Sequence, residues 1–331
     1  MTATNNPSSW QQQSWNSLFS YIQQDRIPQA LLITGASGLG KYVLAKRFAH
    51  ALLCPNTHTD GSCCGVCNSC LLIKAGTHPD LIKIKPDDDK KSISINKIRH
   101  IVTDTYLKPQ FESYRVLIIN PADVMTTQAA NAFLKCLEEP TERTIFILIS
   151  NKPNKLPATI ISRCQKLSVT LPEKHRLYDW LNGQGIHDNQ ETYLNLVRGG
   201  IFTAQQIIDE PLLKQRTDCF ADWLAIAKQR NHPALISEKW QKMPETELLN
   251  WLISWMSDVI KCACGSNQAQ LCNQDMAKNL QELAQQLHLK SLYKLYDHLL
   301  SSRRQLATQV NFQMMLEEIL VQWQQLNGRA Q

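Results

Sequence analysis

The 331-residue sequence lacks any continuous apolar run long enough to cross a membrane. A membrane-spanning helix needs about 18 or more apolar residues in succession. The opening stretch, MTATNNPSSWQQQSW, also lacks the basic start and apolar core of a secretion signal. We therefore expect a soluble, cytoplasmic protein with no membrane partner.

A strong excess of one charge is also missing. The chain has 35 lysine and arginine residues against 29 aspartate and glutamate residues, which gives a formal net charge of +6. Proteins that bind nucleic acid directly usually carry a pronounced basic patch. The charge balance permits contact with nucleic acid but does not establish it.

Cysteine, by contrast, is abundant, with 11 residues in the chain. Five of them fall between Cys54 and Cys70. In a chain without a secretion signal, such a cluster indicates metal binding before it indicates disulfides.

Hydrophobic patterning divides the chain into an α/β part and a helical part. Helical periodicity follows Lys41 and recurs at 95–107 and 126–139, where Pro140 should stop the helix. Because apolar strands alternate with these helices, we expect a parallel sheet covered on both faces. After about residue 168 only helical periodicity remains. The predicted strands are ALLIT at 30–34, LIKI at 81–84, RVLII at 115–119, TIFILIS at 144–150 and KLSVT at 166–170.

The stretch GASGLGKY, between the first strand and the following helix, has the spacing G-x-x-x-x-G-K of a phosphate-binding loop. In such a loop the backbone N–H groups attract phosphate, and the lysine reaches the terminal phosphates. The candidate cofactor-binding residues are Gly35, Gly38, Gly40 and Lys41.

Two parts of an ATP-hydrolysing site are missing around this loop. Tyr42 replaces the serine or threonine whose short hydroxyl holds Mg²⁺. The strand RVLII runs into Asn120 and Pro121 instead of an acidic pair, and we expect Asp123, three residues beyond Asn120, to stay away from the loop. ATP is therefore not expected to bind productively, although nucleotide binding without hydrolysis stays open.

The cysteine cluster has the spacing of a metal site. Cys64, Cys67 and Cys70 form C-x2-C-x2-C, and Cys54 precedes them by ten positions. Four thiolates predict a closed, structural zinc site. An iron–sulfur cluster and free or oxidised thiols are the alternatives, although the cysteine-proline that completes a ferredoxin pattern is absent. Cys63 could exchange with Cys64 as a ligand.

Taken together, several stretches resemble the delta-prime family of subunits of the bacterial DNA polymerase III clamp loader, which are AAA+ proteins. The resemblance covers about residues 28–170. It implies an AAA+ nucleotide-fold domain at 1–170 with a zinc module at about 54–70, a helical lid at 171–210 and a helical collar at 211–331. The stretches are ALLITGASGLGKYVLAKRFAHALLC, the four cysteines, AGTHPDLIKI, AANAFLKCLEEP and ATIISRCQKL.

The resemblance gives Arg163 a specific role. In this family the arginine of the Ser-Arg-Cys motif reaches into the ATP site of a neighbouring subunit, where a planar guanidinium stabilises charge on the transferring phosphate. Spacing alone would instead favour an arginine that caps the helix at LPATII or pairs with a carboxylate. Phe202 stands where ATP-binding relatives carry a nucleotide-sensing arginine, and Arg198 is out of register with that position.

The implied function is that of a non-hydrolysing clamp-loader subunit. It would assemble with gamma/tau and delta subunits and, through the complex, act on the sliding clamp and primed DNA. ATP hydrolysis and DNA polymerisation would belong to the assembly and not to this chain. Two alternatives remain, an active ATPase of the gamma/tau type and a zinc-containing adaptor that binds DNA directly. The gamma and tau relatives carry a hydroxyl residue after the loop lysine and end the second strand in Asp-Glu.

Overall fold

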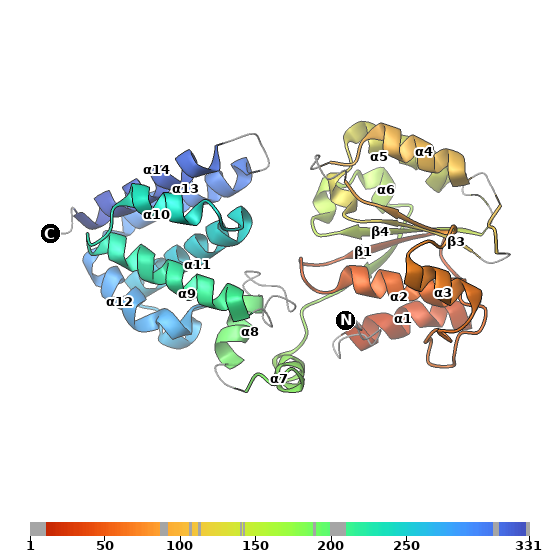
Figure 1. Ribbon diagram of the computed structural model, residues 1–331, viewed down its shortest axis with the longest axis horizontal. Helices are drawn as coiled ribbons and strands as arrows, with labels where there is room; N and C mark the ends of the chain where they lie inside the picture. The colour runs from red at the N-terminus through yellow and green to blue at the C-terminus, as the bar shows by residue number, and fades with distance from the viewer. Residues whose placement is uncertain are drawn as a thin grey trace. The chain divides into compact units, whose positions relative to one another are not determined.

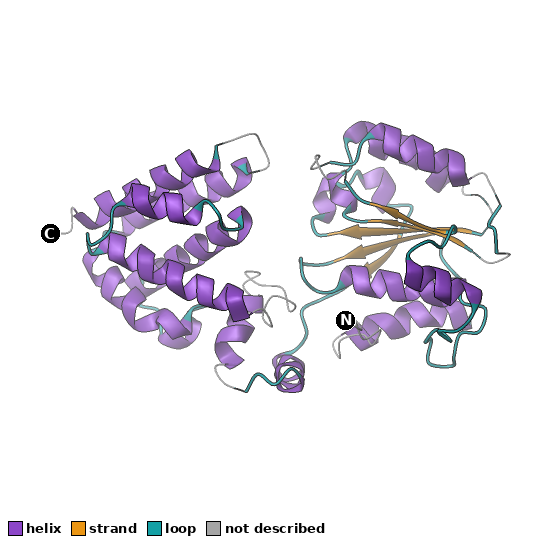
Figure 2. Ribbon diagram, in the orientation of Figure 1, coloured by secondary structure: helices purple, strands orange, loops and turns teal. Residues whose placement is uncertain are grey.

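The chain divides into two compact units, with the boundary between Trp180 and Leu181 (Figure 1). The first combines a sheet with helices, whereas no strand occurs beyond Ser168 in the part of the chain that the structure describes (Figure 2). This computed structural model describes residues 11–86, 92–105, 108–111, 114–139, 141, 143–187, 190–198, 210–306 and 311–328.

The first unit is built on a five-stranded sheet with the order β2-β3-β4-β1-β5, and every neighbouring pair is parallel. Four strands coincide with the predicted apolar runs, and β5 begins one residue before and ends two residues before the predicted KLSVT. Strands β3 and β4 are buried along their whole length. Such complete burial explains why both strands consist of nearly continuous branched residues. The strands are β1 (Ala30–Thr34), β2 (Leu81–Ile84), β3 (Arg115–Ile119), β4 (Thr144–Ser150) and β5 (Gln165–Ser168).

Two hydrophobic cores lie on the two faces of this sheet. Successive side chains of a strand point to opposite faces, so Leu31 and Ile33 of β1 join one core while Ala30 and Leu32 join the other. The first core also takes side chains from α1 and α2, and the second from α4, α5 and α6. These helices are α1 (Gln12–Gln23), α2 (Lys41–Leu53), α4 (Ile95–Thr105), α5 (Thr127–Glu138) and α6 (Ala158–Ile161).

Helix α5 begins with a side-chain cap and ends close to its predicted end. The Thr126 hydroxyl accepts a hydrogen bond from the Ala129 N–H at 3.2 Å, which satisfies a free donor of the first turn. Pro140, the predicted helix stop, lies outside the described residues. A further short helix, α3 (Asn68–Ala75), forms inside the cysteine-rich segment and was not predicted.

The second unit is all-helical around a tryptophan core. Trp223 and Trp323 stack with ring centroids 4.1 Å apart, and the Trp323 indole N–H donates to the Trp223 carbonyl at 3.0 Å. Its helices are α8 (Gln190–Arg198), α9 (Glu210–Ala227), α10 (Pro233–Trp240), α11 (Glu245–Ala263), α12 (Ala277–Gln286), α13 (Leu289–Gln305) and α14 (Phe312–Gly328), while α7 (Lys174–Gly183) crosses the boundary. Among the described residues, no helix combines the length and apolar character needed to span a membrane.

Candidate functional site

The phosphate loop joins β1 to α2 and depends on its glycines. Gly35, Gly38 and Gly40 all have positive φ angles, of 145°, 83° and 73°, which side chains other than glycine adopt only at a cost. A Cβ atom on Gly35 would lie 2.3 Å from the Val169 carbonyl oxygen, just beyond β5. The loop therefore packs directly on the backbone of the neighbouring strand.

Lys41 is turned back into this loop. Its side-chain amine donates hydrogen bonds to the carbonyl of Gly35, at 2.8 Å, and to the carbonyl of Ala36. The residue is 4% exposed, and burial lowers the pKa of its amine to about 8 although the Asp123 carboxylate opposes the shift. The lysine that would hold terminal phosphates is thus bonded to its own loop.

Gln11 also lies against the loop, a contact that the sequence analysis missed. Its side chain is 1% exposed, and its amide nitrogen donates to the Leu39 carbonyl at 2.7 Å. A Cβ atom on Gly40 would come within 2.5 Å of that nitrogen. No local pattern could have identified this glutamine, because 28 residues separate the two partners.

The expectation that Asp123 stays away from the loop is wrong. Asp123 lies in a short turn of 3-10 helix, Ala122–Val124, directly after β3. Its carboxylate accepts a hydrogen bond from the Asn151 N–H at 3.0 Å, and its charge partly opposes the burial that lowers the pKa of Lys41. Parallel strands bring their carboxyl ends to one edge, so the segments after β1, β3 and β4 gather there.

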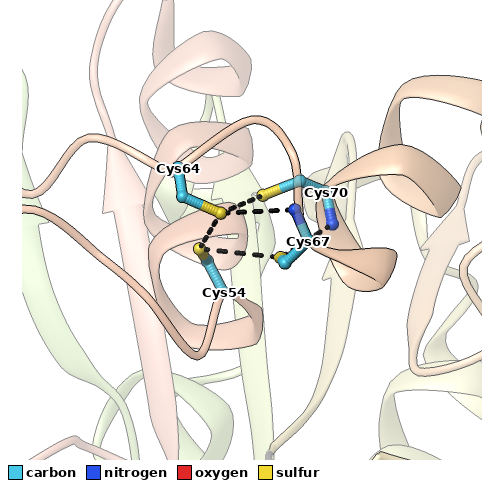
Figure 3. Close-up of side chains that lie close together, drawn as sticks. All are labelled: Cys54, Cys64, Cys67 and Cys70. Carbon is cyan, nitrogen blue, oxygen red and sulfur yellow. Dashed lines mark hydrogen bonds between the residues drawn. The ribbon is translucent and has the colours of Figure 1, made fainter.

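Four cysteines converge at the end of α2, and they are the four predicted ligands (Figure 3). Cys54 follows α2, Cys64 lies in the loop, and Cys67 and Cys70 lie at the start of α3. All four sulfur atoms lie within 4.8 Å of one another. Individual Sγ–Sγ distances are 3.6 Å for Cys54–Cys64, 4.0 Å for Cys54–Cys67 and 3.9 Å for Cys64–Cys70.

These distances fit a single tetrahedral ion. Zn–S bonds of about 2.3 Å would separate the sulfurs by about 3.8 Å. The N–H groups of Cys67 and Cys70 each point at the sulfur three residues earlier, at 3.4 Å. Backbone N–H donors from Val66 and Cys67 lower the pKa of Cys64 to about 6, whereas burial raises the pKa values of Cys67 and Cys70. The cluster therefore has the geometry and the donors to hold a metal such as zinc.

Cys63 does not belong to this four-sulfur group. Its side chain is partly buried, and burial raises the pKa of its thiol to about 11. Of the two adjacent cysteines, the structure brings Cys64 to the other three.

Arg163 follows α6 and makes both contacts that its spacing suggested. Its Nη1 atom donates to the Thr159 carbonyl at 3.1 Å, and Nη2 donates to the Glu138 carboxylate at 2.9 Å. The Arg163 side chain is nevertheless 38% exposed, and that of Glu138 is 50% exposed. The guanidinium is held in place at the surface without being buried.

Arg163 lies at the edge of the sheet opposite the phosphate loop. It lies two residues before the start of β5, and it lines a cavity of about 190 Å³ together with Ala30, at the start of β1, and Gln165, at the start of β5. The loop follows the other end of β1. A strand of this length spans about 15 Å. The guanidinium is therefore remote from Lys41 and from any phosphate bound to its own loop.

Comparisons with known proteins identify the family of this chain. A family model described as "DNA polymerase III, delta subunit" matches residues 10–173, and a second, described as the C terminal of the delta subunit, matches 210–325. DNA polymerase III subunit delta' of Pseudomonas aeruginosa is 31% identical over 325 residues, which cover 96% of this chain and 98% of the relative. The chain belongs to the delta' family. The Yersinia pestis subunit delta' is 29% identical, covering 95% of this chain and 94% of its own.

A more limited likeness connects this delta' family member to another polymerase III subunit. Subunit tau of Bacillus subtilis is 38% identical over 145 residues, covering 44% of this chain and 25% of tau.

One element of the sequence argument against ATP binding stays untested, because Phe202 lies outside the described residues and the Arg198 side chain is not described.

Proposed function

We propose that this delta' chain is a clamp-loader subunit that does not hydrolyse ATP and supplies Arg163 to the ATP site of a neighbouring subunit. The observation that carries the proposal is the position of Arg163. A partly exposed guanidinium at the amino-terminal edge of the sheet is accessible to another chain and remote from its own phosphate loop. A planar guanidinium is suited to stabilise the charge on a transferring phosphate.

The state of the phosphate loop supports the non-hydrolysing half of the proposal. Lys41 donates its hydrogen bonds to its own loop, and Tyr42 follows it in place of a magnesium-binding hydroxyl. Strand β3 leads into Asn120 and Pro121, so it does not supply the usual carboxylate. The loop would then serve only as the connection between β1 and α2. Gly35, Gly38 and Gly40 would supply the positive φ angles that this connection needs.

The remaining parts have structural roles in this proposal. Cys54, Cys64, Cys67 and Cys70 would hold zinc with no open coordination position, so the metal would stabilise the module without catalysing a reaction. The helical segments 171–210 and 211–331 would form a lid and an oligomerisation collar. Through the collar the cytoplasmic chain would join gamma/tau and delta subunits, which together load the sliding clamp on primed DNA.

Replacement of Arg163 in the reconstituted complex tests this function. Arg163→Ala should leave assembly intact and lower ATP turnover at the receiving site by roughly 10³-fold, the scale typical of arginine fingers. Arg163→Lys keeps the charge but loses the planar fork, so it should restore little of that activity. Assembly is measured by size-exclusion chromatography and turnover by phosphate release. Unchanged turnover with Arg163→Ala would remove the proposal.

One observation favours a second candidate, an active ATPase. Asp123 lies close enough to Lys41 to raise the pKa of its amine, and a carboxylate near the loop could hold Mg²⁺ in place of the missing residues. This candidate predicts ATP turnover by the isolated chain that disappears in both Lys41→Ala and Asp123→Asn. We expect no such turnover, because Lys41 and Tyr42 do not offer phosphate and metal the usual ligands.

A further inference from the structure

The ion pair between Arg163 and Glu138 leaves part of the guanidinium available. A guanidinium carries five N–H donors. Two donate hydrogen bonds, one to the Thr159 carbonyl and one to Glu138. Three donors thus remain for a ligand, which is enough for the two-pronged contact that arginine makes with phosphate.

The two acceptors belong to helices that are packed in the core. Glu138 is the last residue of α5, and Thr159 belongs to α6. Both helices contribute to the same hydrophobic core, α5 through residues such as Cys136 and α6 through Ile160. The two acceptors therefore favour one orientation of Arg163 relative to the sheet, whereas a free arginine would sample many rotamers at an entropic cost to each phosphate contact.

The Glu138 carboxylate does not stabilise its own helix. A carboxylate in the last turn of α5 faces the negative end of the helix dipole, an arrangement that disfavours the helix. Its neighbour Glu139 is also exposed and lies just beyond the helix. Of these two acidic residues, Glu138 makes the ion pair with Arg163.

We propose that Glu138 is a positioning residue for Arg163, holding the guanidinium at the sheet edge in the orientation in which its three remaining donors meet the phosphoryl group of a neighbouring subunit's nucleotide. The inference rests on the function proposed above. A carboxylate that competed with phosphate for the arginine would have the opposite effect on turnover. The two effects differ in sign, so a single substitution distinguishes them.

The test is ATP turnover by the reconstituted complex with Glu138→Ala. Exposed ion pairs bias their geometry only modestly, so kcat at the receiving site should fall by about two- to fivefold. The KM for ATP should not change, because Arg163 would act on the transition state. Glu138→Gln should recover part of the loss, since its amide oxygen still accepts a hydrogen bond. The matched control, Glu139→Ala, removes the adjacent carboxylate and should leave turnover unchanged.

A double substitution separates positioning from a general structural effect. If Glu138 acts through Arg163, then Arg163→Ala with Glu138→Ala should match Arg163→Ala alone. A further loss in the double variant, or unchanged or faster turnover with Glu138→Ala, would overturn the inference. If Arg163→Ala itself has no effect, the proposed function fails. If Arg163→Ala lowers turnover but Glu138→Ala does not, the positioning role alone fails.

Discussion

The two ends of the parallel strands each carry a basic residue, and the two residues differ in burial and in their hydrogen-bond partners. At the carboxyl edge Lys41 is 4% exposed and bonded to its own loop. At the amino edge the Arg163 side chain is 38% exposed and held by one carboxylate and one carbonyl. The same fold therefore buries the lysine of its phosphate loop and leaves a different cation, Arg163, partly exposed.

The two edges are also maintained by different forces. Backbone geometry maintains the loop, through glycines with positive φ and the close approach of Gly35 to Val169. An exposed ion pair, which contributes little to stability, maintains the Arg163 edge. Substitutions at the loop should therefore change folding, and substitutions at the arginine should change interactions with other chains.

Outside ATP turnover, the largest effect is expected at the cysteine cluster, which lies at the end of α2. Cys67→Ser removes one of four thiolates, and zinc affinity should fall at least about 100-fold, more than the loss of an outer-shell partner usually costs. Cys63→Ser is the matched control and should retain zinc, because Cys63 is not in the four-sulfur group. Zinc binding by the two variants is measured as metal content per chain and by competition with a chelator. Zinc loss with Cys63→Ser but not with Cys67→Ser would contradict the assignment.

A smaller effect is expected for Gly35→Ala in the loop. The new methyl group would clash with the Val169 carbonyl, and no flexible side chain can move to relieve the contact. We expect the free energy of unfolding to fall by about 3 kcal/mol, measured by urea denaturation.

Gly76→Ala provides the control for backbone strain alone. Gly76 has a φ of 79°, and no atom lies within 4 Å of the place that a Cβ atom would take. Its substitution should cost about 1 kcal/mol. Equal losses for the two variants would mean that the loop does not depend on its contact with β5.

The smallest predicted effect is a pH dependence from Lys41. Its folded pKa of about 8 lies below the ordinary value of 10.5, so between these values the unfolded chain binds more protons than the folded chain. Stability should consequently rise with pH across this window, by about 1 kcal/mol after allowance for solvent screening. Lys41→Met removes the group and should lack this rise. Parallel stability curves for the two proteins would show that the amine is not buried in solution.

Local patterns in the sequence predicted most of the first unit. Apolar runs located the strands, and ligand spacing identified Cys54, Cys64, Cys67 and Cys70 as one group. Helix α3 was missed because its eight residues are too few for clear periodicity among the cysteines. The lengths and number of helices in the second unit also needed the structure, since its apolar stripes are interrupted by many glutamines.

Contacts between distant segments were beyond sequence reasoning. Gln11 meets Leu39 across 28 residues, and Asp123 meets Asn151 across the same separation. Arg163 is intermediate, because spacing suggested a helix carbonyl or a carboxylate and the structure has one of each. Because β1 and β5 are parallel neighbours, Arg163 before β5 and the loop after β1 lie at opposite ends of the strands. No single sequence motif indicates this placement.

The most direct measurement compares ATP turnover by two reconstituted complexes, one with Lys41→Ala and one with Arg163→Ala in this chain alone. Both substitutions remove one basic side chain, from opposite edges of the same sheet. We predict unchanged ATP turnover with Lys41→Ala. With Arg163→Ala, we predict that ATP turnover at the receiving site falls by roughly 10³-fold. The reverse result, a loss with Lys41→Ala and none with Arg163→Ala, would contradict the account.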